Sequence, residues 1–108
     1  MRTNKETKKK IYSIIKENKQ DTNEEKELLL RAKTIIQLIE LREKKGYSQK
    51  EVAALMGVSN QQVAKFESCA NSPTLTFLVK YASAIKSNIE VTVKGIKLSD
   101  IEKKANEN

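Results

Sequence analysis

SQKEVAALMGVSNQQVAKFE, residues 48–67, contains two signals for the start of a helix, eleven residues apart. Ser48 is followed three residues later by Glu51, and Ser59 is followed in the same way by Gln62. In each pair the serine hydroxyl can accept a hydrogen bond from the third helical amide, while the longer side chain reaches back to the serine amide. The pattern predicts two short helices in close succession.

The residues between and within these helices predict how they pack. Gly57 can adopt a positive φ, the conformation that ends many helices. Apolar residues recur at helical spacing on one face of each helix: Val52, Ala53 and Met56 on the first, Val63 and Phe66 on the second. Two short helices that share a buried seam across a glycine turn form a helix-turn-helix.

The other face of the second predicted helix is polar and rich in amide side chains. At about 100° per residue, the side away from the apolar seam carries Asn60, Gln61, Gln62 and Lys65. An amide offers a donor and an acceptor in one plane, as the edge of a base in the major groove requires. Such a face can also be merely solvated, but on the second helix of this motif we favour base recognition.

The same residues resemble the Cro/repressor type of helix-turn-helix, often called XRE-like. The resemblance covers about residues 36–86 and rests on SQKEVA (48–53), GVS (57–59), FE (66–67) and NSPTL (71–75). It implies double-stranded DNA as partner, with base contacts from Gln49, Ser59, Asn60, Gln61, Gln62 and Lys65. Because amides at helix N-termini attract anions, we expect phosphate contacts at Ser48, Lys50, Asn71 and Thr74.

Cys69 departs from the family pattern, because it stands where the family usually has glycine after the recognition helix. A cysteine tolerates positive φ poorly, so we expect a reshaped turn in which Asn71 takes the special conformation. Cys69 is also the single cysteine of the chain. It cannot form an internal disulfide, which is typical of a reducing, cytoplasmic location.

The composition favours a binding protein over an enzyme. The 108 residues indicate one domain, and 21 Lys and Arg against 14 Asp and Glu give a net charge of +7, which favours a polyanionic partner. Residues 1–20 hold seven Lys or Arg and two Glu, so most of this excess lies outside the motif. Histidine is absent, and one cysteine cannot build a metal site, so we expect no catalysis, metal or cofactor. No signal peptide or membrane span is expected.

The N-terminal part predicts two helices. Residues 8–18 fit a short basic helix with a narrow isoleucine stripe that cannot fold alone. It must dock on the next helix, a second subunit, another protein or DNA phosphates, and a membrane surface is a weaker option. A long helix follows, from the capping box of Thr22 and Glu25 to about Lys45 before Gly46.

This long helix carries more apolar residues than a small DNA-binding core needs. Leu38 and Leu41 suffice for that core, and leaving the others in water would be costly at roughly 25 cal/mol per Å². The surplus predicts a contact with a partner or a second subunit through residues 1–35, anchored by Ile11, Ile14, Ile15, Leu28, Leu29, Ile35 and Ile36.

After the motif, a helix is predicted from Pro73 or Thr74 to about Ile85, followed by a strand. Residues 89–94 alternate apolar and polar, and no other strand is evident in the sequence. A lone strand needs a partner for its backbone groups, so we expect it to pair across a two-fold axis in a homodimer, through Ile89, Val91 and Val93.

These observations predict an all-α, Cro/repressor-like bundle divided into residues 1–35, 36–86 and 87–108. The arrangement is similar to HigA-type antitoxins, which implies a RelE/HigB-type ribonuclease toxin as partner and repression of the shared operon from a pseudo-palindromic operator. The basic N-terminal segment fits poorly with toxins that are themselves basic. A stand-alone phage- or plasmid-type repressor is the alternative, and a binding module without DNA function is a third.

Overall fold

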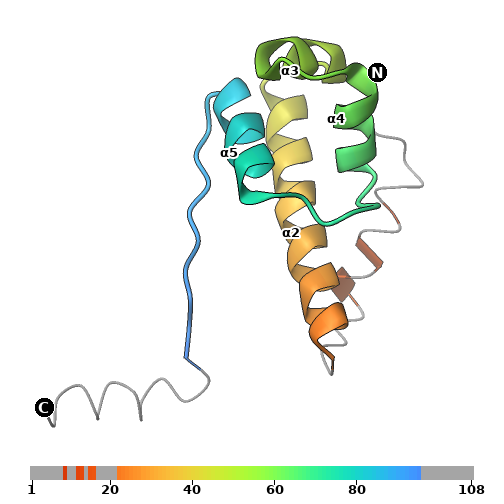
Figure 1. Cartoon of the computed structure of the whole chain (residues 1–108), viewed down its shortest axis with the longest axis vertical. Coiled ribbons are helices and arrows are strands. Elements are labelled where there is room, and N and C mark those ends of the chain that lie inside the picture. Colours follow the sequence, from red (N-terminus) through yellow and green to blue (C-terminus); the bar gives the residue numbers. More distant parts are fainter. Residues whose placement is uncertain (1–8, 10–11, 14, 17–21, 96–108) are drawn as a thin grey trace, which may run out of the picture.

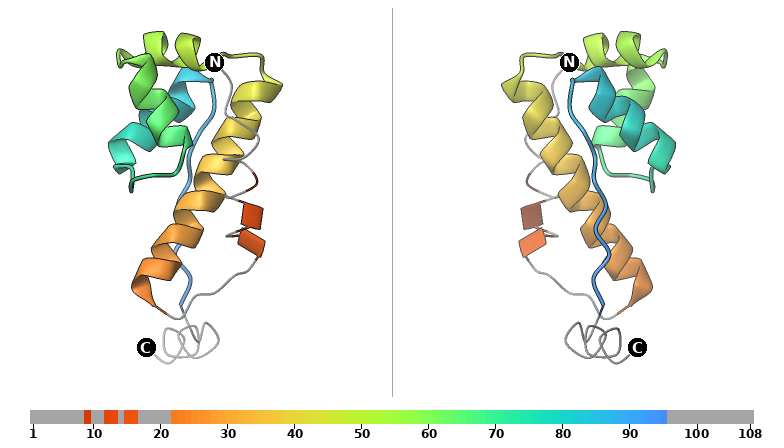
Figure 2. Two further views of the ribbon diagram at one scale, coloured as in Figure 1. Left: turned by 90° about the vertical axis from the view of Figure 1, so that its right-hand side faces the viewer. Right: turned by 90° about the vertical axis from the view of Figure 1, so that its left-hand side faces the viewer.

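The computed structural model describes residues 9, 12–13, 15–16 and 22–95 as a helical bundle (Figure 1). Its helices are α2 (Asn23–Lys44), α3 (Gln49–Met56), α4 (Asn60–Glu67) and α5 (Leu75–Ala84). Helices α3, α4 and α5 gather at the C-terminal end of α2, whose N-terminal part extends beyond them (Figure 2). Within the described ranges no strand is formed, and no helix is long and apolar enough to cross a membrane.

The predicted capping boxes are confirmed at three helix starts. Thr22, Ser48 and Ser59 each accept a hydrogen bond from the third helical amide, and Glu25, Glu51 and Gln62 return one to the cap amide. The returning bond of Glu51 lowers the pKa of that carboxyl, because the Ser48 amide stabilises its charged form. The bounds of all four helices therefore agree with the sequence to within a residue or two.

The turn between α3 and α4 is also confirmed. Gly57 adopts φ 72°, and the amide of Val58 donates to the carbonyl of Ala53 at 3.0 Å. This left-handed turn brings the apolar faces of α3 and α4 together. Val52 and Val63, one from each helix, are both fully buried in the core.

The core lies where α2 meets the other three helices. Ile35 and Ile39 of α2 and Ile85 after α5 have no exposed surface. Phe66 of α4 lies between two aromatic rings of α5, with its centroid 5.0 Å from those of Phe77 and Tyr81. Tilted pairs at this distance add attraction to the burial of area.

The surplus apolar residues of α2 are not surface anchors, which corrects the expectation from sequence. Leu29, Ile35 and Ile36 are 3%, 0% and 4% exposed within their own chain, and Leu28 is half-buried. The reason is that the N-terminal half of α2 packs against the loop between α4 and α5, which extends the core. Leu41, which was expected in the core, is 37% exposed instead.

The described residues of the N-terminal segment contact α2 of the same chain. Ile15 packs against the core, and the hydroxyl of Tyr12 donates to Glu40 Oε2 at 2.7 Å. Of the four docking options open from sequence, packing on the chain's own next helix is the one observed for these residues. Ile11 and Ile14 lie outside the described residues.

Cys69 itself adopts the left-handed conformation, with φ 61°, so the expectation that Asn71 would do so is wrong. The strain is tolerated because the surroundings fix the turn. The Cys69 side chain is 9% exposed, and Arg31 Nη1 donates to its carbonyl at 2.9 Å. A buried side chain and an anchored carbonyl here offset the preference for glycine.

Residues 87–95 leave α5 as an irregular segment, so the expected strand is not formed in the single chain (Figure 1). Ile89 packs against the core, whereas Val91 and Val93 are 71% and 90% exposed. The physical reason is that a strand needs a ladder partner, and the described part of the chain supplies none.

Candidate nucleic-acid interface

The exposed side of α4 is the amide-rich face anticipated from sequence. Ser59, Asn60, Gln61, Gln62 and Lys65 are all exposed, while Val63, Phe66 and Glu67 on the other side are buried. Two of the five are already engaged, because the Ser59 hydroxyl accepts from the Gln62 amide and Gln62 Oε1 accepts from the Ser59 amide at 2.9 Å. The side chains of Asn60, Gln61 and Lys65 therefore have the greater freedom to reach a ligand.

A buried carboxylate holds α4 against the other helices. Glu67 accepts hydrogen bonds from Arg42 Nε at 2.7 Å and Nη2 at 2.9 Å, from Gln49 Nε2 at 2.9 Å and from the Tyr81 hydroxyl at 2.5 Å. These donors come from α2, α3 and α5. One side chain on α4 thus joins all four helices, and we call these four residues the Glu67 cluster.

The Glu67 cluster is deeply buried and its groups hold fixed protonation states. The side chains of Arg42 and Glu67 are 2% and 1% exposed. Burial acts to lower the pKa of Arg42, but the Glu67 hydrogen bonds and charge more than offset it, so the pKa lies above its ordinary value. Burial, and then the Glu67 charge, raise the pKa of Tyr81. Arg42 therefore stays charged and Tyr81 stays a hydrogen-bond donor.

Gln49 is an internal side chain, which corrects its assignment as a base-reading residue. It is 2% exposed, with Nε2 bonded to Glu67, and its Oε1 has no hydrogen-bond partner among the described residues. Its position as the first residue of α3 had placed it at the surface by analogy with exposed helix starts. Base contact from Gln49 requires the side chain to turn outward.

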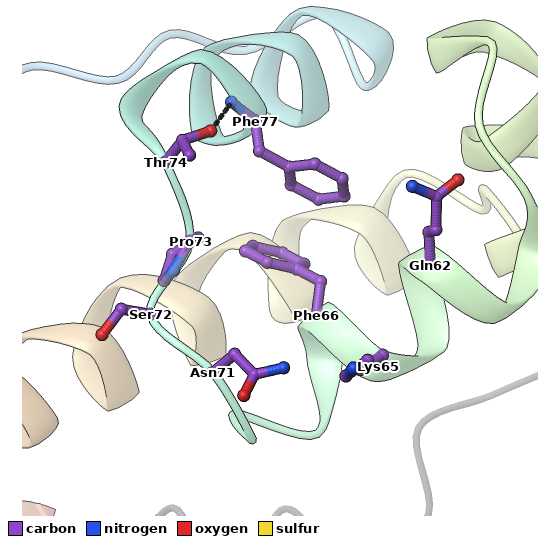
Figure 3. A pocket seen from close by; sticks show the side chains of 8 residues that line it. All are labelled: Gln62, Lys65, Phe66, Asn71, Ser72, Pro73, Thr74 and Phe77. Carbon is purple, nitrogen blue, oxygen red and sulfur yellow. Dashed lines mark hydrogen bonds between the residues drawn. The ribbon is translucent and has the colours of Figure 1, made fainter.

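The start of α5 forms an open hollow beside α4, of about 310 Å³ (Figure 3). The rings of Phe66 and Phe77 face each other across it, with Lys65 and Asn71 at one edge and Thr74 at the other. Thr74 is the N-cap of α5, and its hydroxyl accepts from the Phe77 amide at 3.0 Å. The next two amides of α5 have no intrahelical acceptor, so this edge suits an anion.

The predicted phosphate-contacting residues fall into two groups that flank the exposed side of α4. Ser48 caps α3 and is half-buried, and Lys50 beside it is exposed. Asn71 and Thr74, both exposed, lie at the hollow at the other end. The structure thus brings the expected polar residues, Gln49 excepted, to the surfaces around one helix.

Arg42 and Glu67 are the positional residues that sequence reasoning missed. Both stand at helical spacing within an apolar stripe, Arg42 three residues after Ile39 and Glu67 four after Val63. Opposite charges on the buried faces of two neighbouring helices are the signal that predicts such a pair.

Comparison with known proteins agrees with this geometry. The family model described as "Helix-turn-helix" matches residues 38–91, half of the chain. No curated protein and no solved structure matched the chain. The matched range contains α3, α4 and α5 and the C-terminal part of α2. The chain belongs to the helix-turn-helix family, whose domain is that of DNA-binding transcription regulators and not of an enzyme.

Proposed function

We propose that this protein is a sequence-specific transcriptional repressor that reads the major groove of double-stranded DNA with α4. The observation that carries the proposal is the set of free amide and ammonium groups on the exposed side of a helix whose other side is fixed by the Glu67 cluster. A rigid helix presents these groups at one geometry, which base discrimination needs. Asn60, Gln61 and Lys65 are the main readers, with Ser59 and Gln62 beside them.

The phosphates on either side of the groove are held by the two flanking groups. At α3 the contacts come from the first amides of the helix and from Lys50, and at α5 they come from Asn71 and the amides after Thr74. These contacts fix the register of α4 without reading sequence. Gln49 contributes by holding α3 against Glu67.

The active form in this proposal is a homodimer on a pseudo-palindromic operator, with half-sites about 34–36 Å apart. Support comes from Val91 and Val93, which are large, apolar and exposed in a segment that lacks a ladder partner. Pairing of residues 89–94 with a second copy would cover these side chains and satisfy their backbone groups.

Selection of binding sites from a random duplex library tests the proposal. We expect enrichment of a two-fold symmetric site with a spacing of one helical turn. Recovery of sequences with no shared element would contradict base readout. Val91→Pro removes a ladder donor and should shift the protein toward monomer in sedimentation while its helical circular dichroism is retained. A wild-type chain that is monomeric at micromolar concentration would rule out the dimer.

A HigA-type antitoxin is the second candidate, on the resemblance described above. The burial of Leu29, Ile35 and Ile36 removes most of the proposed toxin contact, although Leu30 on the same helix is 68% exposed and could anchor a smaller one. Co-expression with a RelE/HigB-type ribonuclease toxin separates the candidates. Rescue of growth supports the antitoxin, and unchanged toxicity together with operator binding supports the stand-alone repressor.

A further inference from the structure

The loop between α4 and α5 is fastened to the N-terminal half of α2 at two points. Arg31 Nη1 donates to the carbonyl of Cys69 at 2.9 Å, and the Ser72 hydroxyl donates to Glu27 Oε2 at 2.7 Å. The two fastened residues enclose Asn71, and the loop leads directly to the cap of α5 at Thr74. The loop therefore cannot shift without breaking its bonds to α2.

The two fastening residues on α2 also hold each other. Arg31 Nε donates to Glu27 Oε2 at 2.9 Å, and Arg31 Nη2 donates to Glu27 Oε1 at 2.5 Å. The planar guanidinium meets the carboxylate with two parallel bonds and still has a third nitrogen for the Cys69 carbonyl. The Arg31 side chain is 14% exposed, so this bond is shielded from water. We call Glu27 and Arg31 the loop clamp.

The backbone of Cys69 explains why the loop needs a clamp. With φ 61° this residue occupies a conformation that side chains other than glycine adopt at a cost. A loop that starts from a strained turn relaxes to other conformations unless outside bonds hold it. The bond from Arg31 is made to the carbonyl of this same residue, and so it opposes relaxation where relaxation would begin.

The loop clamp lies outside the part of the chain that the family shares. Glu27 and Arg31 precede residue 38, where the match to the helix-turn-helix family begins. The N-terminal extension of α2 therefore contributes to the position of a loop within the family domain.

We propose that Glu27 and Arg31 are positioning residues for DNA binding, which fix Asn71 and the first amides of α5 at the height of the phosphate backbone. This inference rests on the proposed function, because it assigns Asn71 and the start of α5 to phosphate contacts. The clamp residues do not touch DNA themselves. Their contribution is sequence-independent, since phosphates carry no base information.

The test compares Arg31→Met with Lys33→Met, an exposed lysine two residues along the same helix. Each substitution removes one positive charge from α2, but only the first removes the clamp. Affinity is measured by titration on the selected operator and on random duplex at several salt concentrations. We expect Arg31→Met to weaken both by about the same factor, on the order of tenfold, and to reduce the salt slope by about one per subunit. Lys33→Met should change affinity by less than about twofold.

A second measurement reports on the loop without DNA. Amide resonances of residues 69–73 should shift in Arg31→Met, while those of Val52 and Tyr81 in the core should stay in place. Arg31→Lys keeps the charge and can reach one of the two partners, so it should restore part of the affinity. If Arg31→Met does not fold, Arg31→Lys and Glu27→Gln carry the comparison.

The outcomes separate the inference from the function on which it rests. Failure of the wild-type chain to bind any duplex would overturn the proposed function. Wild-type binding together with an Arg31→Met titration equal to that of Lys33→Met would overturn the clamp alone. Loss of affinity confined to the operator, with random duplex unaffected, would also overturn it, because that result indicates an effect on base readout.

Discussion

Replacement of Glu67 by glutamine is the most direct test of the frame that holds α4. The side chains have nearly the same shape, but glutamine lacks the charge and presents an amide donor to its neighbours. In the native protein the carboxylate accepts from Arg42, Gln49 and Tyr81, all of them donors. An amide group in their midst can accept from one side only and meets another donor with its own hydrogens.

The expected loss of stability follows from the burial of the pair. Removing one partner of a buried ion pair costs about 3–5 kcal/mol, because the remaining charge stays desolvated. The lower end applies here, since Arg42 Nη1 keeps its bond to the Tyr47 carbonyl at 2.8 Å and Glu43 Oε2 stands 4.0 Å from Nη2. We expect a loss of about 3 kcal/mol, a large part of the roughly 4–11 kcal/mol typical of a folded unit of roughly 70 residues.

Urea denaturation followed by circular dichroism measures this loss. Glu90→Gln, an exposed site in the irregular segment, is the matched control and should stay within about 0.5 kcal/mol of wild type. Operator affinity of Glu67→Gln should fall as well, because α4 loses its fixed orientation. A Glu67→Gln protein within about 1 kcal/mol of wild type would refute the view that the charged carboxylate holds the helices together.

Three further outcomes are expected. Gln61→Ala should cost about 1–3 kcal/mol on the selected operator and relax one base pair per half-site in a titration, with folding unchanged; equal loss on random duplex would contradict base readout. Lys86→Gly should raise the unfolding free energy by about 1 kcal/mol in urea, because Lys86 is exposed and adopts φ 55°; a loss would count against strain there. The Arg31 hydrogen bond lowers the pKa of Glu27, so the clamp contributes stability above the ordinary carboxyl pKa and loses it as pH falls through the lowered value; the melting difference between Glu27→Gln and wild type should therefore shrink between about pH 5 and 3, and a difference independent of pH would contradict this.

The elements near residues 48–67 were predictable because their signals are local. A serine with a glutamate or glutamine three residues on begins a helix wherever it stands, and Gly57 ends one for steric reasons that need no tertiary context. The exposed side of α4 followed from helical spacing alone. The candidate site was thus recognisable in its outward-facing half.

The inward-facing half was not predictable, since it depends on residues distant in sequence. Gln49 looks like a surface residue until Glu67, 18 residues away, is placed beside it. The surplus of leucine and isoleucine on α2 was assigned to a partner because nothing in the sequence shows that the loop at Cys69 folds back over them. The strand at residues 89–94 depends on a second chain, which a single chain cannot supply.

The convergence of four helices on one carboxylate also governs how the protein opens. Moving any one of α2, α3, α4 or α5 away exposes a charged cluster to a half-formed, poorly solvated environment, so partial opening costs nearly as much as complete unfolding. Amide hydrogens in all four helices should therefore exchange with solvent at one common rate. Proteolysis of the described chain should begin in the irregular residues 87–95, and leave the four helices intact until the whole bundle opens.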